Sequence, residues 1–492
     1  MNFRTAVKKN LAFFLLIIIF LIIKIFFMAQ HHEFFWDESV YIGIGKFIFS
    51  GGDAGLWEPI RPPVLPLLLG AAWKTGLDIT VLSEILILAF SAGLMIMTYL
   101  IACELFNRKT GLVSVFLIAF TPVFFKFSSL VMTGIPSTFF ALSAIYFYIR
   151  KKSLFLVGLF AGLAFLTRFP QVLIIFSIAF LIIIQRIRET RNAKDDFIVL
   201  SRRLTNFSSG ILVFLTPYLI FNYFMYRQQL VNVHHMIFRP FILAFEHQSN
   251  AWEAVNGLFY NYFFYFITLF QQNYLFVFAI AGILLALAVR KNRSVLLPLL
   301  VPLFFYIFYF SIILNKQARF SLAFLPIVAI FAAYGIIEVF RYALKSRALV
   351  KYTLVMIMLF AALFSYNSVI MEDWRIYYYL PSGPDIKVSE FYYGYIADLE
   401  EPIMTSDPTS LAYIDKLMIP IYSNNIEGPV MYEENKDRAS TIIFHPDVYP
   451  CFPDDLECRK RNRAFFYTLM EENELLEVRE YYGTEYYIFS RR

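Results

Sequence analysis

The chain has 492 residues, of which 59% are apolar and 16% charged, and its formal net charge is +6. An average soluble domain is about 45–50% apolar and about 25% charged, so this composition excludes the soluble globular class and indicates an integral membrane protein. The basic residues cluster in short loops between apolar runs, where membrane topology accounts for them, so we expect no nucleic-acid partner.

Apolar runs long enough to cross a bilayer recur over the first 370 residues. A helix of about 20 apolar residues spans the hydrocarbon core with its backbone amides paired internally. The first run is longer than the apolar core of a signal peptide and no small-residue cleavage site follows it, so we expect it to remain as an anchor. The sequence predicts about eleven spans, at roughly 11–29, 83–103, 111–126, 130–149, 153–167, 169–185, 207–226, 272–289, 294–314, 320–340 and 349–369.

The distribution of Lys and Arg orients these spans. Basic residues are retained on the cytoplasmic side of a membrane. The basic N-terminus is therefore expected in the cytoplasm, and the later basic clusters fall on the same side if the spans alternate. The opposite side receives the loop 30–80, the loop 227–258 and the chain after about residue 370.

The stretch HHEFFWDES, residues 31–39, follows the first span and places Asp37 and Glu38 beside aromatic side chains. An acid held near water but partly shielded from it can act as a general base. We expect this stretch to be irregular, so that Asp37 faces a substrate as the base while Glu38 braces the loop. The alternative is that both acids cap a helix that begins near Ser39.

Two apolar segments are too ambiguous to count as spans. The segment RPPVLPLLLGAAW, 61–73, is shorter than a span and suits an interfacial or re-entrant piece. The aromatic-rich segment 258–270 fits a helix that lies at the membrane interface, because a further span there would reverse the agreement of the basic clusters.

From about residue 371 the composition changes, because polar residues and Tyr become frequent and no apolar run is long enough to cross a membrane. The short runs PIMTS, MIPIYS, STIIFHP and YYIFSR have the composition of β-strands, and a helical pattern covers about 460–477. The sequence therefore predicts a small extracytoplasmic α/β domain at 371–492 after a transmembrane domain at 1–370.

The three cysteines lack metal-site spacing, so zinc and iron–sulfur chemistry have no support. Cys451 and Cys458, in CFPDDLEC, form a local disulfide if their face of the membrane is oxidising, and otherwise remain two thiols. Cys103 lies inside a predicted span, where we expect it to pack. His31 and His32 lie near acids, but their spacing does not support a metal site.

Four segments occur in the order found in one enzyme group. They are DESVYI after the first span, the Pro-rich RPPVLP, GLFAGLAFLTRFP at 158–170 and ARFSLAFLPIVAIFAAYG at 318–335. Together they resemble the GT-C superfamily of membrane glycosyltransferases, and most of all its dolichyl-phosphate-mannose protein mannosyltransferases and aminoarabinose lipid A transferases. The resemblance covers about the first 370 residues.

The resemblance implies an inverting glycosyltransferase that acts on the outer face of a membrane. We expect a plasma membrane rather than an endoplasmic reticulum membrane, because no retention signal ends the chain. Such an enzyme moves a sugar from a polyprenyl-phosphate donor to a hydroxyl of a protein, lipid or glycan acceptor. Its leaving phosphate needs cations in a low-dielectric site. Arg61, Arg168 and Arg319 are the candidates, because outer-side arginines run against the topology rule; their alternative role is to reach lipid headgroups.

The second outer loop contributes His234, His235 and Arg239, which either bind the sugar or phosphate or are ordinary polar loop residues. Some members of the group carry a second acid near the outer end of the fourth span that helps to bind a metal or the donor. Here VMTGIPSTFF has Gly134 at that position, so no metal ligand is assigned and a divalent cation such as Mg²⁺ or Mn²⁺ stays open.

Two other classes of function compete with an enzyme. A carrier or flippase for a lipid-linked or small polar solute would place ionisable groups inside the spans, whereas here the acids lie in the outer loops. A scaffold with a sensing tail would leave the Asp-Glu pair, the Pro-rich segment and the arginines unexplained. The sequence therefore favours surface chemistry.

Overall fold

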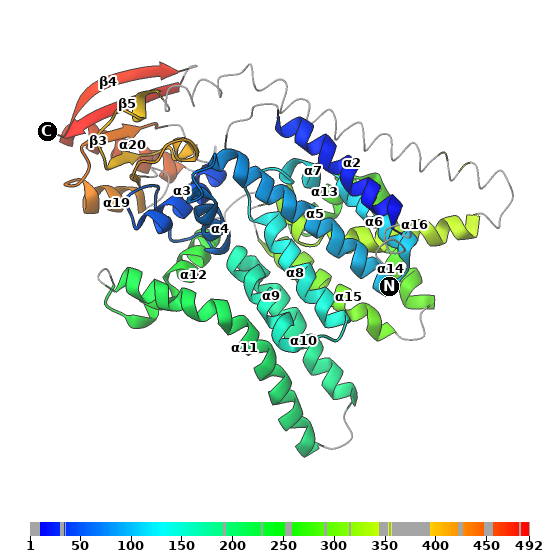
Figure 1. Cartoon of the computed structure of the whole chain (residues 1–492). Helices are drawn as coiled ribbons and strands as arrows, with labels where there is room; N and C mark the ends of the chain where they lie inside the picture. The colour runs from blue at the N-terminus through cyan, green and yellow to red at the C-terminus, as the bar shows by residue number, and fades with distance from the viewer. Residues whose placement is uncertain are drawn as a thin grey trace. The chain divides into compact units, whose positions relative to one another are not determined.

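The computed structural model describes residues 10–29, 34, 36–189, 193–227, 230–250, 258–289, 293–313, 316–343, 353, 356, 394–421, 427–446, 456–481 and 484–491 (Figure 1). The chain divides into two compact units. The helical unit comprises Met1–Ala29, Ile60–Val64 and Ile85–Trp374. The sheet unit comprises Gln30–Pro59, Leu65–Glu84 and Arg375–Arg492.

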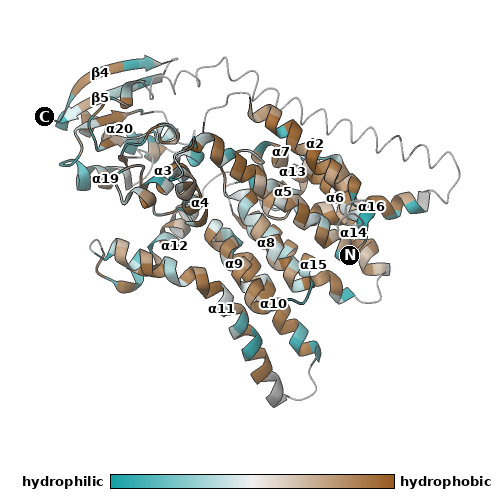
Figure 2. Ribbon diagram, in the orientation of Figure 1, coloured by the Kyte–Doolittle hydropathy of each residue, from teal (hydrophilic) through white to brown (hydrophobic). Residues whose placement is uncertain are grey.

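The helical unit is built from apolar helices, most of them coloured as hydrophobic in Figure 2. Among the described residues, five helical segments are long and apolar enough to cross a membrane: Leu11–Met28, Ile79–Leu105, Phe169–Glu189, Phe197–Tyr226 and Arg293–Ile312. The helices that lie in this unit, wholly or for most of their length, are α2 (Leu11–Met28), α5 (Ile79–Leu105), α6 (Arg108–Ala119), α7 (Pro122–Phe127), α8 (Gly134–Ile149), α9 (Leu154–Thr167), α10 (Val172–Glu189), α11 (Ala193–Tyr226), α12 (Val233–Asn250), α13 (Leu258–Gln272), α14 (Phe278–Val289), α15 (Leu297–Ile312) and α16 (Leu325–Ala343).

Two expectations about these helices are wrong. The run at 111–126 is not one span but two helices, α6 and α7, because the chain is extended at Thr121. Pro122 follows, and proline disfavours a helical conformation in the residue before it. The predicted outer loop 227–258 contains an 18-residue helix, α12. The last predicted span, 349–369, lies almost wholly outside the described residues.

Helices α9 and α11 pack so closely that each requires a glycine. A Cβ atom added at Gly158 of α9 would lie 1.9 Å from the carbonyl oxygen of Phe207, and one at Gly210 of α11 would lie 2.0 Å from that of Phe155. Backbone atoms cannot move aside without shifting a helix. This contact fixes the first half of α9 against α11.

The sheet unit contains one five-stranded sheet in the order β2-β1-β3-β5-β4. Strands β1 (Ile403–Thr405), β2 (Met418–Pro420) and β3 (Thr441–Phe444) are parallel, whereas β5 (Thr484–Arg491) runs antiparallel to β3 and to β4 (Asn473–Tyr481). Strands β1, β2 and β3 lie within three of the β-like runs, and β5 contains the fourth, YYIFSR, and begins two residues before it. Strand β4 was not expected, and it begins inside the end of the predicted helical pattern. The helix observed in this region is α20 (Leu456–Glu472), which ends directly before β4.

Alternate strand residues face opposite sides of the sheet and build two cores. Ile403, Ile443 and Ile488 belong to one core, together with Val40 and Ile44. The last two lie on α3 (Trp36–Ser50), so a helix of the loop expected at 30–80 covers one sheet face. Met404, Ile442, Phe444 and Phe489 belong to the other core, beneath α19 (Glu427–Asn435) and α20.

The expected division of the chain at residue 370 therefore differs from the observed units. Residues 30–59 and 65–84 join the C-terminal segment, because α3 and the turn after it are part of the hydrophobic core of the sheet. Backbone hydrogen bonds support the same grouping: Gly55 donates to Lys416 and accepts from Met418, each at 2.8 Å.

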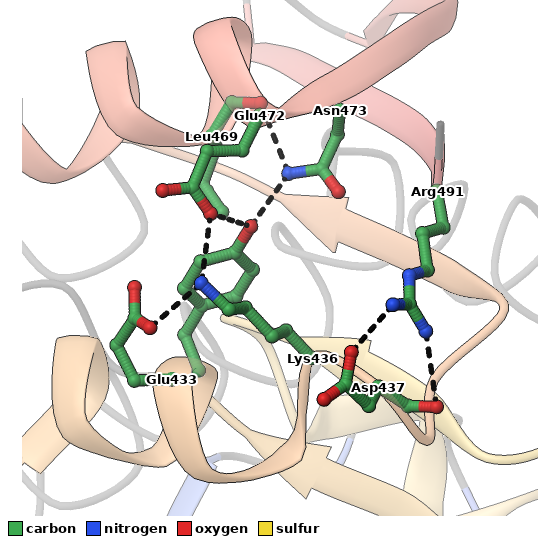
Figure 3. Close-up of polar contacts among 8 residues, drawn as sticks. Glu433, Lys436, Asp437, Leu469, Glu472, Asn473 and Arg491 are labelled. Carbon is green, nitrogen blue, oxygen red and sulfur yellow. Dashed lines mark hydrogen bonds and ion pairs between the residues drawn. The ribbon is translucent and has the colours of Figure 1, made fainter.

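A polar network connects α19 and α20 to the sheet (Figure 3). The hydroxyl of Tyr432 donates to Glu472 at 3.0 Å and accepts from Asn473 at 2.9 Å. Lys436 forms ion pairs with Glu433 at 2.7 Å and Glu472 at 3.3 Å. The network links α19 with the junction of α20 and β4 and gives the sheet unit a fixed outer layer.

The structure describes two of the three cysteines. Cys458, on α20, is disulfide-bonded. Cys451 lies outside the described residues. Cys103 is a half-buried free thiol in α5, as expected for a packing residue.

Candidate functional site

The acidic pair lies in the first turn of α3. The helix begins at Trp36, so the expectation of an irregular stretch up to Ser39 is wrong for Asp37 and Glu38. Acids are favoured in a first turn because the free N–H groups there carry partial positive charge. The alternative reading placed the pair at a helix N-terminus near Ser39, whereas the helix begins three residues earlier, at Trp36, and Glu38 is buried.

The two carboxylates nevertheless point to different surroundings. Neighbouring residues on an α-helix are about 100° apart around the axis. Glu38 is fully buried, whereas Asp37 is half-buried. Asp37 is thus the member of the pair that remains partly exposed. His31 and His32 lie outside the described residues.

Hydrogen bonds across the sheet unit hold α3. The hydroxyl of Ser39 donates to the carbonyl of Thr409 at 2.9 Å. The amine of Lys46 is buried and donates to the carbonyls of Leu411 and Ile414. Sequence reasoning missed Lys46, although it is the only charged residue of the run YIGIGKFIFS.

In the helical unit, Arg168 and Arg319 converge on one aromatic ring. Arg168 follows the last residue of α9 in an extended conformation, and Pro170 lies two residues further on, where its missing N–H could not continue the helix. Its guanidinium carbon lies 5.0 Å from the ring centroid of Phe320 and 5.9 Å from that of Phe310. The guanidinium carbon of Arg319 lies 5.9 Å from the same Phe320 ring.

The ring between the arginines belongs to the 3-10 helix η5 (Ala318–Ala323). Phe320 stacks on Phe310 of α15 with ring centroids 5.7 Å apart. Arg319 also donates to Gln317 and to the sulfur of Met132. These contacts bring together the ends of α9 and α15, the turn before α8, and η5.

A third cation, Lys316, belongs to this group and was missed by the sequence analysis. Its amine donates to the carbonyls of Phe310 at 2.7 Å and Ser311 at 2.8 Å, and it lies 5.7 Å from the ring centroid of Tyr265. Burial lowers the pKa of Lys316 to about 8. The signal in the sequence was its place in NKQAR, just before Arg319 and outside the neighbouring spans.

These residues form a cationic aromatic cluster, defined here as Arg168, Lys316, Arg319, Phe310 and Phe320. Guanidinium groups held against aromatic rings keep their charge and their N–H donors while losing part of their hydration. Such a group suits a ligand that carries a negative charge next to an apolar chain.

The other predicted binding residues are placed less centrally. Arg61 is half-buried in the bend before α4 (Val64–Trp73) and belongs to the helical unit. His234, His235 and Arg239 lie on α12 rather than in a loop. The two histidine rings are in contact, with centroids 4.2 Å apart, and His234 is exposed.

Helix α12 reaches the turn that carries Arg168. The ring of Phe241 stacks on Phe165 with centroids 5.4 Å apart and contacts Phe169 at 4.9 Å. Because residues 234, 238 and 241 share one helical face by their spacing, His234 lies on the side of α12 that makes this contact.

A metal site has no assigned ligands. In the part of the chain that the structure describes, no group of three or more His, Cys, Asp or Glu side chains is arranged to hold an ion. At Gly134, where some glycosyltransferases of the expected group have an acid, an added Cβ would lie 3.2 Å from Leu322 of η5. A side chain there would have to be accommodated by the Leu322 side chain.

Comparisons with known proteins concern the family and the fold of the chain. The family model for dolichyl-phosphate-mannose-protein mannosyltransferase matches residues 61–201. No curated protein sequence is significantly similar to the chain. Among solved structures, ArnT from Cupriavidus metallidurans bound to undecaprenyl phosphate matches with a TM-score of 0.66 at 13% identity, covering 98% of each chain.

A second solved relative is archaeal. The oligosaccharyltransferase AglB from Archaeoglobus fulgidus, in complex with an inhibitory peptide and a dolichol-phosphate, matches with a TM-score of 0.53 at 14% identity. That match covers 90% of this chain and 70% of AglB. At such identities the likeness is one of fold, and it confirms the expected resemblance to the GT-C membrane glycosyltransferases.

Proposed function

We propose, from this GT-C-like fold, that the chain is a glycosyltransferase that moves a sugar from a polyprenyl-phosphate donor to an acceptor hydroxyl on the extracytoplasmic face of a membrane. The acceptor is a protein, lipid or glycan. The observation that carries the proposal is the cationic aromatic cluster, in which two arginines share the Phe320 ring. The lipid phosphates bound by ArnT and AglB support the same class of donor.

The cluster matches the charge that develops during transfer. As the bond between the anomeric carbon and the phosphate oxygen breaks, negative charge collects on the leaving phosphate. Arg168, Arg319 and Lys316 would neutralise it, and cations held in place in a low-dielectric site stabilise a transition state more than mobile water does. Phe310 and Phe320 would contact the apolar part of the donor.

Asp37 is the proposed base. The acceptor hydroxyl attacks the anomeric carbon from the side opposite the phosphate, so the configuration inverts. Asp37 takes the hydroxyl proton and later releases it to solvent, and the polyprenyl phosphate leaves with the bonding electron pair. General-base assistance of this kind contributes about 10²–10⁴-fold. Glu38 would hold the first turn of α3 from its buried position.

The proposed location is a plasma membrane, with about eleven spans and the N-terminus in the cytoplasm. The acidic helix α3 and the strands β1 and β2 share one hydrophobic core, so they lie on the same side of the membrane. The clustering of Lys and Arg in the loops on the opposite side supports an extracytoplasmic location for α3 and for the strands.

Arg61, His234, His235 and Arg239 would bind the sugar or the phosphate from the bend before α4 and from α12. A divalent cation, Mg²⁺ or Mn²⁺, remains a proposal without ligands, and no step above depends on it. The membrane lipids and the acceptor complete the set of partners.

One observation favours a second function, that of a flippase or carrier. Lys24 is fully buried in the span α2, with its amine 4.4 Å above the ring centroid of Phe125. Ionisable groups inside spans mark transport pathways in many carriers. A carrier would move a labelled polyprenyl-phosphate sugar across the membrane without transferring it.

The deciding experiment measures transfer of a labelled sugar from a polyprenyl-phosphate donor by membranes that contain the protein. Asp37→Asn keeps the shape of the side chain but removes the base, so we expect transfer to fall at least about a hundredfold. Asp53→Asn, at an exposed acid in the same unit, is the matched control. Full transfer by Asp37→Asn would show that Asp37 is not the base, and labelled donor moving across without transfer would favour the carrier.

A further inference from the structure

The amine of Lys46 has a complete set of acceptors inside the sheet unit. It lies 2.8 Å from the carbonyl oxygen of Leu411, 2.9 Å from that of Ile414 and 2.8 Å from a carboxylate oxygen of Asp415. A lysine amine has three N–H donors, and these three oxygens account for all of them. The side chain is 1% exposed, whereas that of Asp415 is 60% exposed.

Two of the acceptors lie in or just after a short helix. Leu411 belongs to the 3-10 helix η8 (Thr409–Ala412), and Ile414 lies two residues beyond its end. The last carbonyls of any helix lack partners within it, and Lys46 supplies a donor to that of Leu411 from α3. At the other end, a carboxylate oxygen of Asp407 accepts from the amide of Thr409 at 3.0 Å and from its hydroxyl at 2.8 Å.

The first half of α3 is joined to the same helix. Ser39 donates to the carbonyl of Thr409, and Val40 and Ile44 share a core with Leu411. Ser39 and Lys46 are seven residues apart and so lie on one face of α3, two turns from each other. Bonds at both points prevent α3 from rotating or sliding against η8.

Apolar packing alone would not require a lysine here. A buried charge costs desolvation, and a well-packed apolar residue of similar size is often at least as stabilising. A directional group at one position can instead select one register among several that have similar packing. Lys46 selects the register of α3 along η8, and this register fixes the position of the first turn of α3, which carries Asp37.

We propose that Lys46 is a positioning residue, which locks α3 to η8 and thereby sets the place of the proposed base Asp37. This inference rests on the proposed function for its effect on rate, but not for its effect on α3. A displacement of a catalytic group by about 1 Å can lower the reaction rate about 10²-fold. Because Lys46 does not belong to the proposed donor site, donor binding should not weaken.

The test compares Lys46→Met with Asp415→Asn in the full-length protein. For Lys46→Met we expect kcat to fall at least about tenfold while KM for the donor changes less than about twofold. Asp415→Asn leaves both carbonyl acceptors in place, so we expect its kcat to stay within about twofold of the parent. An unchanged kcat in folded Lys46→Met would overturn the proposal.

Hydrogen exchange separates this proposal from the proposed function. We expect the amides of 37–46 to exchange faster in Lys46→Met and at the parental rate in Asp415→Asn. If the parent transfers no sugar at all, the proposed glycosyltransferase is wrong, and exchange alone decides whether Lys46 locks α3. Unchanged exchange in Lys46→Met overturns the lock.

A second variant covers the case in which Lys46→Met does not fold. Lys46→Gln shortens the side chain and leaves two N–H donors in place of three, so at least one of the three oxygens loses its partner. We expect the same fall in kcat and the same faster exchange of α3. Parental values of both in Lys46→Gln would overturn the proposal.

Discussion

Arg168 and Arg319 lie over the same ring: their guanidinium carbons are 5.0 Å and 5.9 Å from the centroid of Phe320. One arginine follows α9 and the other opens η5, so the pair forms only when these segments pack together. Both charges are held by packing against one ring, so their positions depend on each other. This is the pair to which we assign the leaving phosphate in the proposed reaction.

The shared ring predicts that the two arginines act as one unit. We expect Arg168→Gln or Arg319→Gln alone to lower kcat/KM for the donor about a hundredfold, because each removes charge from the leaving phosphate. The double variant should lose less than the product of the two single losses. Steady-state kinetics of all four proteins measure this, with Arg341→Gln, an exposed arginine paired with Glu338, as the control. Strict additivity would contradict a shared site.

The pKa of Lys316 predicts a pH dependence of donor binding. Burial lowers this pKa from the ordinary 10.5 to about 8, so the amine is charged below about pH 8 and neutral above it. We expect KM for the donor to rise as the pH rises through about 8. Lys316→Arg keeps a charge at every accessible pH and should shift that rise out of range. A parental inflection that survives in Lys316→Arg would assign it to another group.

Close packing at Gly45 predicts a loss of stability on substitution. A Cβ there would lie 2.6 Å from the carbonyl oxygen of Pro66 and 2.7 Å from the amide nitrogen of Gly70, and both are backbone atoms of the segment that includes α4. We expect Gly45→Ala to destabilise the protein by about 1–3 kcal/mol. Thermal unfolding in detergent measures this. Gly394→Ala, where nothing lies within 4 Å of the added atom, should be neutral.

The sheet unit combines the segment after α2 with the C-terminal segment, so positions in both should face the same side of the membrane. Single cysteines at Asp53 and Lys460, both exposed in that unit, should react with an impermeant maleimide from outside. A cysteine at Arg188, in the last turn of α10, should react only from the cytoplasm. Cys103 is replaced beforehand, because it is a free thiol. Opposite labelling of Asp53→Cys and Lys460→Cys would contradict the shared unit.

Local patterns were enough to predict much of the helical unit. The runs at 11–29 and 83–103 became α2 and α5, because a long uninterrupted apolar segment has few alternatives to a helix in a membrane. The break at Pro122 was visible in the sequence but was outweighed by the apolar run around it. Helix α12 was hidden because its polar residues and Pro240 resemble a loop.

The site, like the helical unit, was predictable from the sequence only in part. The sequence alone determined the membrane class, the strands β1, β2, β3 and β5, and which acids and arginines were worth testing, because composition and short-range periodicity act on neighbouring residues. Only the tertiary structure decided that Glu38 is buried, that α3 completes the core of the sheet, and that Lys316 joins Arg168 and Arg319. Those features depend on burial and on contacts between distant segments, and no local pattern carries that information.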